Sequence, residues 1–322
     1  MRFPILGLHH VTATVDDAQA DLDFGVDALG LRLVKKTVNF DNDGVYHFYY
    51  GDERGTPGTL WTTFPYGTVG IMPGSKGAGQ VTVTSFSVPA GSLDIWKKRL
   101  RERGFTVNDA PPRFGEESVI VLDPSGLLIE LVATKSDSRT PWLANGLDEA
   151  SAVRGIHSVT LTELNPEPTF TFMREWFGFG ITEEMDGRKR VSVNGTGPGK
   201  SVDILTSSRG ERARNGLGTV HHVAMAIGSS EAQNELREAL MKAGIQVTPI
   251  IDRSYFQSIY FREPGGVLFE VATTAPGFDV DESLAELGKG LKLPPWEEAR
   301  RTQIASHLPE VHYDTSGHGP AQ

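Results

Sequence analysis

Two histidine doublets are the residues of this chain best suited to chemistry. His9 and His10 lie near the N-terminus, whereas His221 and His222 lie in the last third of the 322 residues, so four of the nine histidines stand in adjacent pairs. The chain has no cysteine, which excludes disulfides and thiolate metal sites. Any metal must therefore be held by histidine or carboxylate side chains.

Strand periodicity distinguishes the two members of each doublet. The doublets lie in the apolar runs "GLHHVTATV" and "TVHHVAMAI", which are typical of β-strands. Successive side chains of a strand point to opposite faces. His9 and His221 share their faces with large apolar residues that we expect to pack against a helix. His10 and His222 are therefore predicted to face the other, concave side.

A glutamate from a third predicted strand joins these two histidines. In "GVLFEVATT", Glu270 lies on the face opposite Val267 and Phe269. The preceding residues 264–266, Pro-Gly-Gly, predict a three-residue hairpin loop with a glycine in a left-handed conformation. That register places Tyr260 opposite Glu270, so Tyr260 is predicted to face inward as well.

Two neutral imidazoles and one carboxylate form the ligand set of a facial triad. A lone inward histidine is more often an ordinary core residue than a ligand. Three strands that each deliver a ligand-type residue to one face favour a metal site instead. The set suits non-haem Fe(II), with neighbouring coordination positions left for a substrate and O₂, and Mn(II) also fits it.

Internal repeats indicate how the chain positions these residues. "VIVLDPSGLLIELVAT" at Val119–Thr134 matches "SIYFREPGGVLFEVATT" at Ser258–Thr274 in one register, which aligns Glu130 with Glu270. Similar strand openings divide the chain into four modules that start near residues 5, 80, 154 and 218. Each module is predicted to contain one strand, one helix and three short strands.

A polar segment with Pro and Gly separates the two halves of the chain. We expect an N-terminal domain over residues 1–142 and a C-terminal domain over residues 152–275. The tail over residues 276–322 is expected to pack partly as helices and then fray.

Composition narrows the classes of partner. The formal net charge of −10 disfavours nucleic acid and anionic membranes. No stretch approaches eighteen apolar residues, and the first residues do not resemble a secretory signal, so we expect a cytoplasmic protein. A homo-oligomer is compatible with the sequence.

The chain resembles the vicinal oxygen chelate superfamily, which includes glyoxalases, bleomycin-resistance proteins and extradiol dioxygenases. Within it, the chain is most similar to Fe(II)-dependent hydroquinone-type ring-cleaving dioxygenases. The likeness runs from about residue 6 to residue 275 and is carried by "GLHHVTATVDDAQADLDF", "LGLRLVKKTVNFDND", "YHFYYGDERGTPGTLWTTFP", "TVHHVAMAI" and "DRSYFQSIYFREPGGVLFE". It implies an α+β fold of four βαβββ modules that form two cup-shaped mixed sheets with helices outside.

The resemblance also implies residue roles. It implies that iron is bound by His10, His222 and Glu270, and that the surrounding site includes His9, His221, Arg253 and Tyr260. The competing interpretation of the two outer histidines is a core residue bonded to backbone or water. Arg253 could equally be a surface arginine, and Tyr260 an ordinary strand aromatic.

In this superfamily two modules make one cup. Because the three proposed ligands come from the first and fourth modules, we predict that these modules share the metal-bearing cup, with Thr59–Pro65 leaving a fourth ligand position empty. The other cup offers Glu130 and Asp203 but lacks histidines at the positions where ligands would be needed, and it is expected to be structural. There Ser158 corresponds to His10, Val83 or Thr84 to His222, and Ile120 to Tyr260.

The implied reaction is ring cleavage of a dihydroxylated aromatic, most like a hydroquinone, with both atoms of O₂ inserted. Arg253 or His9 would stabilise developing negative charge, and Tyr260 would donate a hydrogen bond or proton. The alternatives are a catechol-type extradiol dioxygenase, a glyoxalase-like isomerase or lyase, and a non-catalytic drug-binding protein on the same fold.

Overall fold

Four modules with one order of elements make up most of the chain, in a computed structural model that describes residues 2–185, 187–207 and 210–313. The first module comprises β1 (Ile5–Val15), α1 (Ala18–Leu22), β2 (Arg32–Asn39), β3 (Asn42–Gly51) and β4 (Leu60–Pro65). The second comprises β5 (Gln80–Pro89), α2 (Leu93–Glu102), β6 (Val107–Asp109), β7 (Glu117–Leu122) and β8 (Leu128–Thr134).

The second half of the chain repeats this order. The third module comprises β9 (Gly155–Glu163), α3 (Pro166–Phe172), β10 (Gly180–Met185), β11 (Arg188–Ser192) and β12 (Ser201–Thr206). The fourth comprises β13 (Thr219–Ile227), α4 (Ser230–Lys242), β14 (Ile251–Asp252), β15 (Phe256–Arg262) and β16 (Leu268–Pro276). The predicted βαβββ pattern is confirmed in all four modules.

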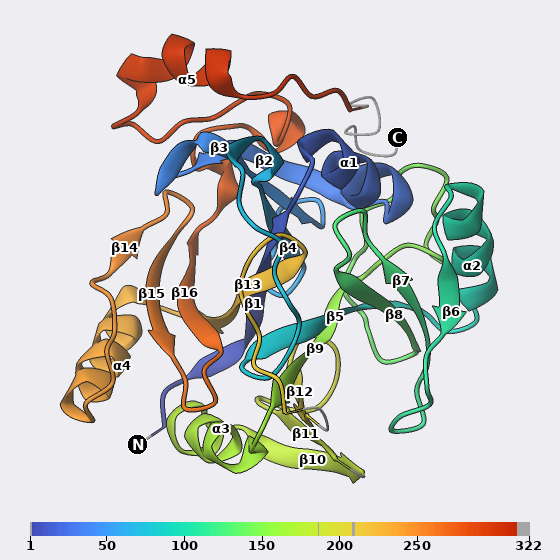
Figure 1. Cartoon of the computed structure of the whole chain (residues 1–322), viewed down its shortest axis with the longest axis vertical. Helices are drawn as coiled ribbons and strands as arrows, with labels where there is room; N and C mark the ends of the chain where they lie inside the picture. Colours follow the sequence, from blue (N-terminus) through green and yellow to red (C-terminus); the bar gives the residue numbers. More distant parts are fainter. Residues whose placement is uncertain (1, 186, 208–209, 314–322) are drawn as a thin grey trace.

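The strands form two eight-stranded mixed sheets. One has the order β14-β15-β16-β13-β1-β4-β3-β2, and the other has the order β10-β11-β12-β9-β5-β8-β7-β6. The first sheet therefore joins the first and fourth modules and the second sheet joins the second and third, as predicted. Helices α2 and α4 lie on the outside at opposite ends of the molecule (Figure 1). The predicted α+β class is confirmed.

Local sequence explains how α4 leaves the concave face of its sheet open. Helix α4 begins after Ser229, whose side chain accepts a hydrogen bond from the backbone N–H of Ala232. It ends just before Gly244, which has φ +83°. Leu236 and Leu240 lie on one helix face and are fully buried. The helix thus covers the apolar outer face and leaves the inner face to polar side chains.

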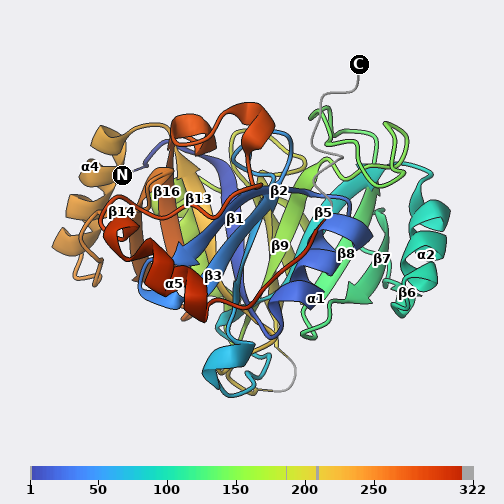
Figure 2. The ribbon, with the colours of Figure 1, turned by 90° about the horizontal axis from the view of Figure 1, so that it is seen from above.

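The C-terminal tail runs across β2 and β3 (Figure 2). It contains short helical segments at Phe278–Val280, Leu284–Glu286 and Glu298–Arg300, followed by α5 (Arg301–His307). The predicted helical packing of the tail is confirmed, whereas the predicted fraying concerns residues 314–322, which lie outside the described residues. Within the described ranges, no helix has the length and apolar character needed to cross a membrane.

A buried lysine anchors this tail. The Lys35 side chain on β2 is fully buried, and its Nζ lies 2.5 Å from Asp281 Oδ1 and 2.5 Å from Glu282 Oε2. The same Nζ donates to the carbonyl oxygen of Phe278 at 3.1 Å. Phe278 in turn packs against Phe256 on β15, with ring centroids 6.3 Å apart. The start of the tail therefore packs on the inner face of the first sheet, where Phe278 also contacts Tyr49, the residue opposite Lys35.

Candidate metal centre

Three potential metal ligands meet on the concave face of the first sheet. His10 on β1, His222 on β13 and Glu270 on β16 place one ligand atom each within 4.8 Å of the others. Glu270 Oε2 lies 2.8 Å from His222 Nε2 and 3.2 Å from His10 Nε2. The exposed fractions of the three residues are 2%, 5% and 0%. Residues from opposite ends of the chain thus form one buried cluster.

Strand pairing accounts for this convergence. In the antiparallel pair β1–β13, His10 lies opposite Ala224 and Thr12 lies opposite His222. In the parallel pair β13–β16, the same Ala224 lies beside Glu270. The small alanine side chain sits between the three larger ones, so their polar ends can approach each other.

The outer histidines correct one sequence expectation. His9 and His221 do not pack against helices; His221 lines the same cavity as His222. The β1–β13 register skips His9 between Leu8 and His10, and it skips His221 on β13. Each is therefore the extra residue of a β-bulge, which redirects a side chain. Strict alternation fails at both doublets for this reason.

The bulges bring the two rings of each doublet together. His9 Nδ1 lies 2.9 Å from His10 Nδ1, and His221 Nδ1 lies 2.7 Å from His222 Nδ1. The other nitrogen of His9, Nε2, lies 3.2 Å from the carbonyl oxygen of Thr273. Each outer histidine therefore fixes the orientation of its inner neighbour.

One set of tautomers satisfies all these contacts. Burial, with the adjacent inner histidine, lowers the pKa of both His9 and His221 to about 3, so both rings are neutral near pH 7. If each outer Nδ1 accepts a hydrogen bond from the inner Nδ1–H, the Nε2 atoms of His10 and His222 carry lone pairs directed toward Glu270. That is the form of imidazole that binds a metal.

The carboxylate also fits a divalent cation. Glu270 Oε1 accepts a hydrogen bond from Ser258 Oγ at 2.5 Å. Glu270 Oε2 is buried and forms no hydrogen bond of acceptable geometry with any described residue. Burial favours the neutral acid, but His10 and His222, when they carry the proton, lower the pKa of Glu270 well below its ordinary value, and a bound divalent cation would favour the carboxylate in the same way. An unsatisfied buried carboxylate oxygen beside two imidazole lone pairs suits a metal ion.

The neighbouring strand offers no fourth carboxylate or histidine at the equivalent level. Thr62 on β4 lies beside Thr12 in the parallel pair β1–β4. Its hydroxyl is hydrogen bonded to Thr12 Oγ1 at 2.8 Å and lies 3.0 Å from His47 Nε2. As predicted, the strand that could supply a fourth metal ligand carries a threonine at that position.

Tyr260 and Arg253 form a pair above the cluster. Tyr260 lies opposite Glu270 in the β15–β16 hairpin, as predicted. Arg253 Nε donates to the Tyr260 hydroxyl oxygen at 3.2 Å, and Arg253 Nη2 lies 3.1 Å from Asp41 Oδ2. Burial and the charge of Glu270 raise the pKa of Tyr260 above its ordinary value, so the hydroxyl is protonated.

A cavity of about 430 Å³ opens over these side chains. Its wall includes the histidines described above, His10, His221 and His222, and the Arg253–Tyr260 pair. It also includes His47, Tyr49, Phe64, Tyr66 and Phe256. His47 and Tyr49 were not among the residues predicted from the sequence to lie at the site. Alternation in "VYHFYY" contains the signal, because Tyr46, Phe48 and Tyr50 pack into the outer core and leave His47 and Tyr49 on the opposite face.

Sequence comparison places the chain in a family. The model of the glyoxalase/bleomycin resistance protein/dioxygenase superfamily matches residues 7–131 and 155–271. The chain belongs to this superfamily. The chlorohydroquinone/hydroquinone 1,2-dioxygenase of Sphingobium indicum is 36% identical over 307 residues, which cover 92% of this chain and 94% of that protein.

Other relatives in the superfamily agree. MhqE of Bacillus subtilis, provisionally named a ring-cleaving dioxygenase, is 41% identical over 95% of this chain and 99% of its own length. The crystal structure of a B. subtilis protein provisionally described as a dioxygenase has 38% identity and a TM-score of 0.91, covering 96% of this chain and 98% of that one. Maize glyoxalase I shares only the fold, at 13% identity and a TM-score of 0.61 over 83% of this chain and 92% of its own.

The second cup of this superfamily member contains equivalent positions with different residues. The strand registers of the two cups show which positions are equivalent. Ser158 is equivalent to His10, Val83 to His222, Glu130 to Glu270, Ile120 to Tyr260 and Asp203 to Thr62. The alternative assignment of Thr84 is excluded because Ser85, two residues after Val83, lies beside Glu130. Among the described residues, only the first cup has a cluster of three metal-ligand side chains.

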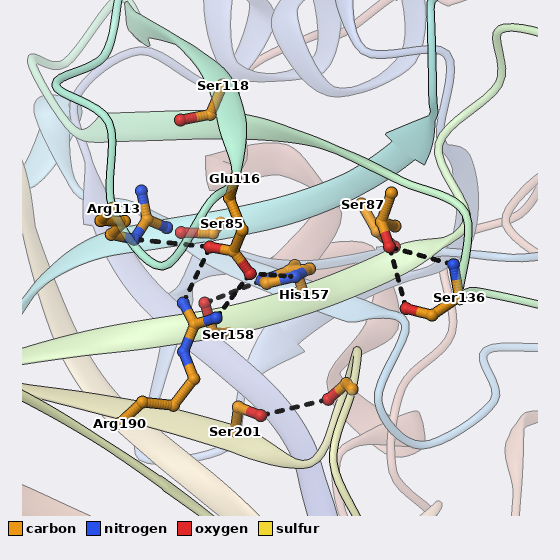
Figure 3. A network of polar contacts seen from close by, with 12 residues as sticks. Ser85, Ser87, Arg113, Glu116, Ser118, Ser136, His157, Ser158, Arg190 and Ser201 are labelled. Atoms are coloured by element: carbon orange, nitrogen blue, oxygen red, sulfur yellow. Dashed lines mark hydrogen bonds and ion pairs between the residues drawn. The ribbon is translucent and has the colours of Figure 1, made fainter. Parts of the chain in front are cut away.

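Ion pairs fill the second cup. Arg113 Nη2 donates to Glu130 Oε2 at 2.6 Å, and Nη1 of the same residue pairs with Glu130 Oε1. Glu116 lies between Arg190 and His157, and the His157 Nδ1 atom lies 3.0 Å from Ser158 Oγ (Figure 3). The carboxylate that matches Glu270 is therefore neutralised by an arginine of the chain itself.

Proposed function

We propose that this protein is an Fe(II)-dependent ring-cleaving dioxygenase that acts on hydroquinones and inserts both atoms of O₂. The observation that carries the proposal is the buried cluster of His10, His222 and Glu270 at the base of a cavity with aromatic walls. The named activities of relatives that match almost the whole chain support ring cleavage, and the S. indicum relative favours a hydroquinone.

The cavity suits a single planar ring. Tyr49, Phe64 and Phe256 supply aromatic contacts, and polar side chains lie both in the histidine cluster and elsewhere on the wall, at Asn39, Asp41 and His47. A volume of about 430 Å³ lies toward the small end of ordinary ligand pockets, which span roughly 300 to 1,000 Å³. A small aromatic with one hydroxyl at the base and one further out fits this distribution of polar and apolar groups.

His10, His222 and Glu270 would hold the metal. The outer histidines would orient the rings of His10 and His222 for this role. When bound, Fe(II) would lower the pKa of a substrate hydroxyl and supply the electron transfer that activates O₂. His9 and His221 hold the inner rings in the required tautomer. Since such outer partners tune metal affinity, we assign them as positioning residues.

The Arg253–Tyr260 pair would stabilise negative charge on the substrate. Arg253 donates to the tyrosine oxygen, so the hydroxyl hydrogen of Tyr260 is free to be donated to a substrate oxygen. The positive charge of Arg253 would stabilise negative charge that develops on the ring or on oxygen. Both groups line the cavity beside the cluster, which is the position that this role requires.

The test is anaerobic reconstitution followed by exposure to O₂. Protein loaded with Fe(II) or with Mn(II) is mixed with hydroquinone, chlorohydroquinone or catechol, and O₂ uptake and ring-opened products are measured. We expect uptake with Fe(II) and hydroquinones, with both atoms of ¹⁸O₂ in the product. Preference for catechol would overturn the substrate assignment. Thioester formation from a hemithioacetal without O₂ uptake would indicate a glyoxalase-like enzyme instead.

A further inference from the structure

His47 stands apart from the other histidines of the cavity. It lies on β3, which is separated from β1 by β4 in the sheet order. The other cavity histidines, His10, His221 and His222, lie on β1 and β13, which carry two of the three residues of the metal-ligand cluster. His47 is therefore the cavity histidine placed to meet a part of the substrate other than the hydroxyl at the cluster.

Three contacts hold the His47 ring in place. Its centroid lies 4.0 Å from that of Tyr49 and 4.3 Å from that of Phe64. Its Nε2 atom lies 3.0 Å from the Thr62 hydroxyl oxygen, which is itself hydrogen bonded to Thr12. The imidazole is thus a rigid polar group flanked by two aromatic rings, and rigid groups lose little entropy when a ligand binds.

One nitrogen of this ring remains for a ligand. Burial, together with His10 and Arg253, lowers the pKa of His47 well below 6.5, so the ring is neutral with one donor and one acceptor nitrogen. Thr62 occupies Nε2, and no hydrogen bond links Nδ1 to any residue in the described part of the chain. Other polar groups of this wall already have partners: Asn39 donates to Tyr66 at 2.8 Å, and Asp41 pairs with Arg253.

We propose that His47 hydrogen bonds with the substrate hydroxyl that lies para to the hydroxyl at the metal-ligand cluster. His47 is then a specificity-determining residue that selects hydroquinones over phenols without a para hydroxyl. A phenolic hydroxyl both donates and accepts, so either tautomer of His47 serves. This inference rests on the proposed function, because it takes the ring hydroxyls of that substrate as its ligand.

The test compares binding of two probes under anaerobic conditions. Hydroquinone and 4-methylphenol differ in whether the para position carries a hydroxyl or a methyl group. The dissociation constant of each is measured by calorimetry on the Fe(II)-loaded protein. We expect the wild-type protein to prefer hydroquinone by roughly tenfold, the usual effect of one well-placed hydrogen bond, and His47→Phe to lose this preference while retaining the ring contacts.

Matched variants separate recognition from folding. His47→Gln keeps a side chain that can donate and accept, so it is expected to retain part of the preference. His307→Phe is the same change of histidine to phenylalanine at an exposed position on α5, and it is expected to leave the preference unchanged. If His47→Phe does not fold, as judged by circular dichroism and bound iron, His47→Leu takes its place.

The outcomes are distinct from those that test the dioxygenase activity. Binding is measured without O₂, so the preference can be present in a protein that never cleaves a ring. A wild-type preference that persists in His47→Phe or His47→Leu overturns the role of His47. The absence of any preference in the wild-type protein overturns it equally.

Discussion

Arg113 and Arg253 occupy equivalent places in the two cups, 140 residues apart, but only Arg113 binds the carboxylate of its own cup. Arg113 pairs with Glu130, whereas Arg253 bonds to Tyr260 and Asp41. The serines beside the two carboxylates are also equivalent, since Ser118 donates to Glu130 and Ser258 donates to Glu270. The first cup thus keeps a carboxylate available for a cation, whereas in the second cup a guanidinium group binds the equivalent carboxylate.

Removing an inner histidine should abolish metal binding in the first cup. His10→Ala deletes one of the three proposed ligand atoms and leaves Glu270 with a buried charge. We expect iron affinity to fall by at least about a hundredfold and ring cleavage to be lost with it. A hundredfold loss is the upper end of the effect of removing a residue that only hydrogen bonds to a metal ligand. Iron content after dialysis and O₂ uptake measure the two effects.

Ser158→Ala is the matched control, because Ser158 occupies the position of His10 in the second cup. It should retain both iron and activity. Full iron occupancy in His10→Ala would contradict the assignment of the ligands.

The arginine of the second cup should contribute to stability and not to metal binding. Arg113→Met removes the partner of Glu130 and leaves a buried carboxylate unpaired. We expect the free energy of unfolding to fall by about 3 to 5 kcal/mol, as is usual when one member of a buried ion pair is removed. Urea denaturation measures the loss, and iron content should stay unchanged.

The double variant Arg113→Met with Glu130→Gln provides the comparison. It removes both charges, so a substantial part of the stability should return. If the double variant were as unstable as Arg113→Met alone, the unpaired charge would not be the cause.

The sequence was sufficient for the modules and for the placement of the inner cluster. Glycine and serine caps, strand alternation and the repeated register predicted the βαβββ order and the pairing of Tyr260 with Glu270. It was not sufficient at His9 and His221. A bulge depends on how two strands far apart in the chain pair, and a single strand's alternation contains no sign of it. His47 was missed because it belongs to no doublet, although the alternation in "VYHFYY" places it on the inner face.

The tail should be held by its buried ion pairs. Lys35→Met removes a fully buried ammonium group and leaves Asp281 and Glu282 without their cation. We expect unfolding free energy to fall by about 3 to 5 kcal/mol and the tail to become sensitive to limited proteolysis. Lys98→Met, which changes a lysine whose side chain is 76% exposed, should have little effect on either measurement. Equal protease resistance of both variants would exclude the proposed anchor.

Asp21 should make stability depend on pH. Its side chain is buried, and Oδ2 accepts hydrogen bonds from the hydroxyls of Tyr50 at 2.7 Å and Thr63 at 2.5 Å. Burial raises the pKa of Asp21 from 3.8 to about 7, although these two hydrogen bonds oppose the shift. Between these values the folded protein binds one proton more than the unfolded chain. Stability therefore falls as pH rises, by roughly 1.4 kcal/mol per pH unit from this group.

Asp21→Asn isolates this contribution. The amide oxygen can accept from both Tyr50 and Thr63, and the side chain cannot ionise. The other titrating groups are common to both proteins. The wild-type protein should therefore lose stability relative to Asp21→Asn as the pH rises from 5 to 7. Urea denaturation at pH 5, 6 and 7 measures this difference. A difference that does not change with pH would mean that Asp21 is ionised throughout this range in the folded protein.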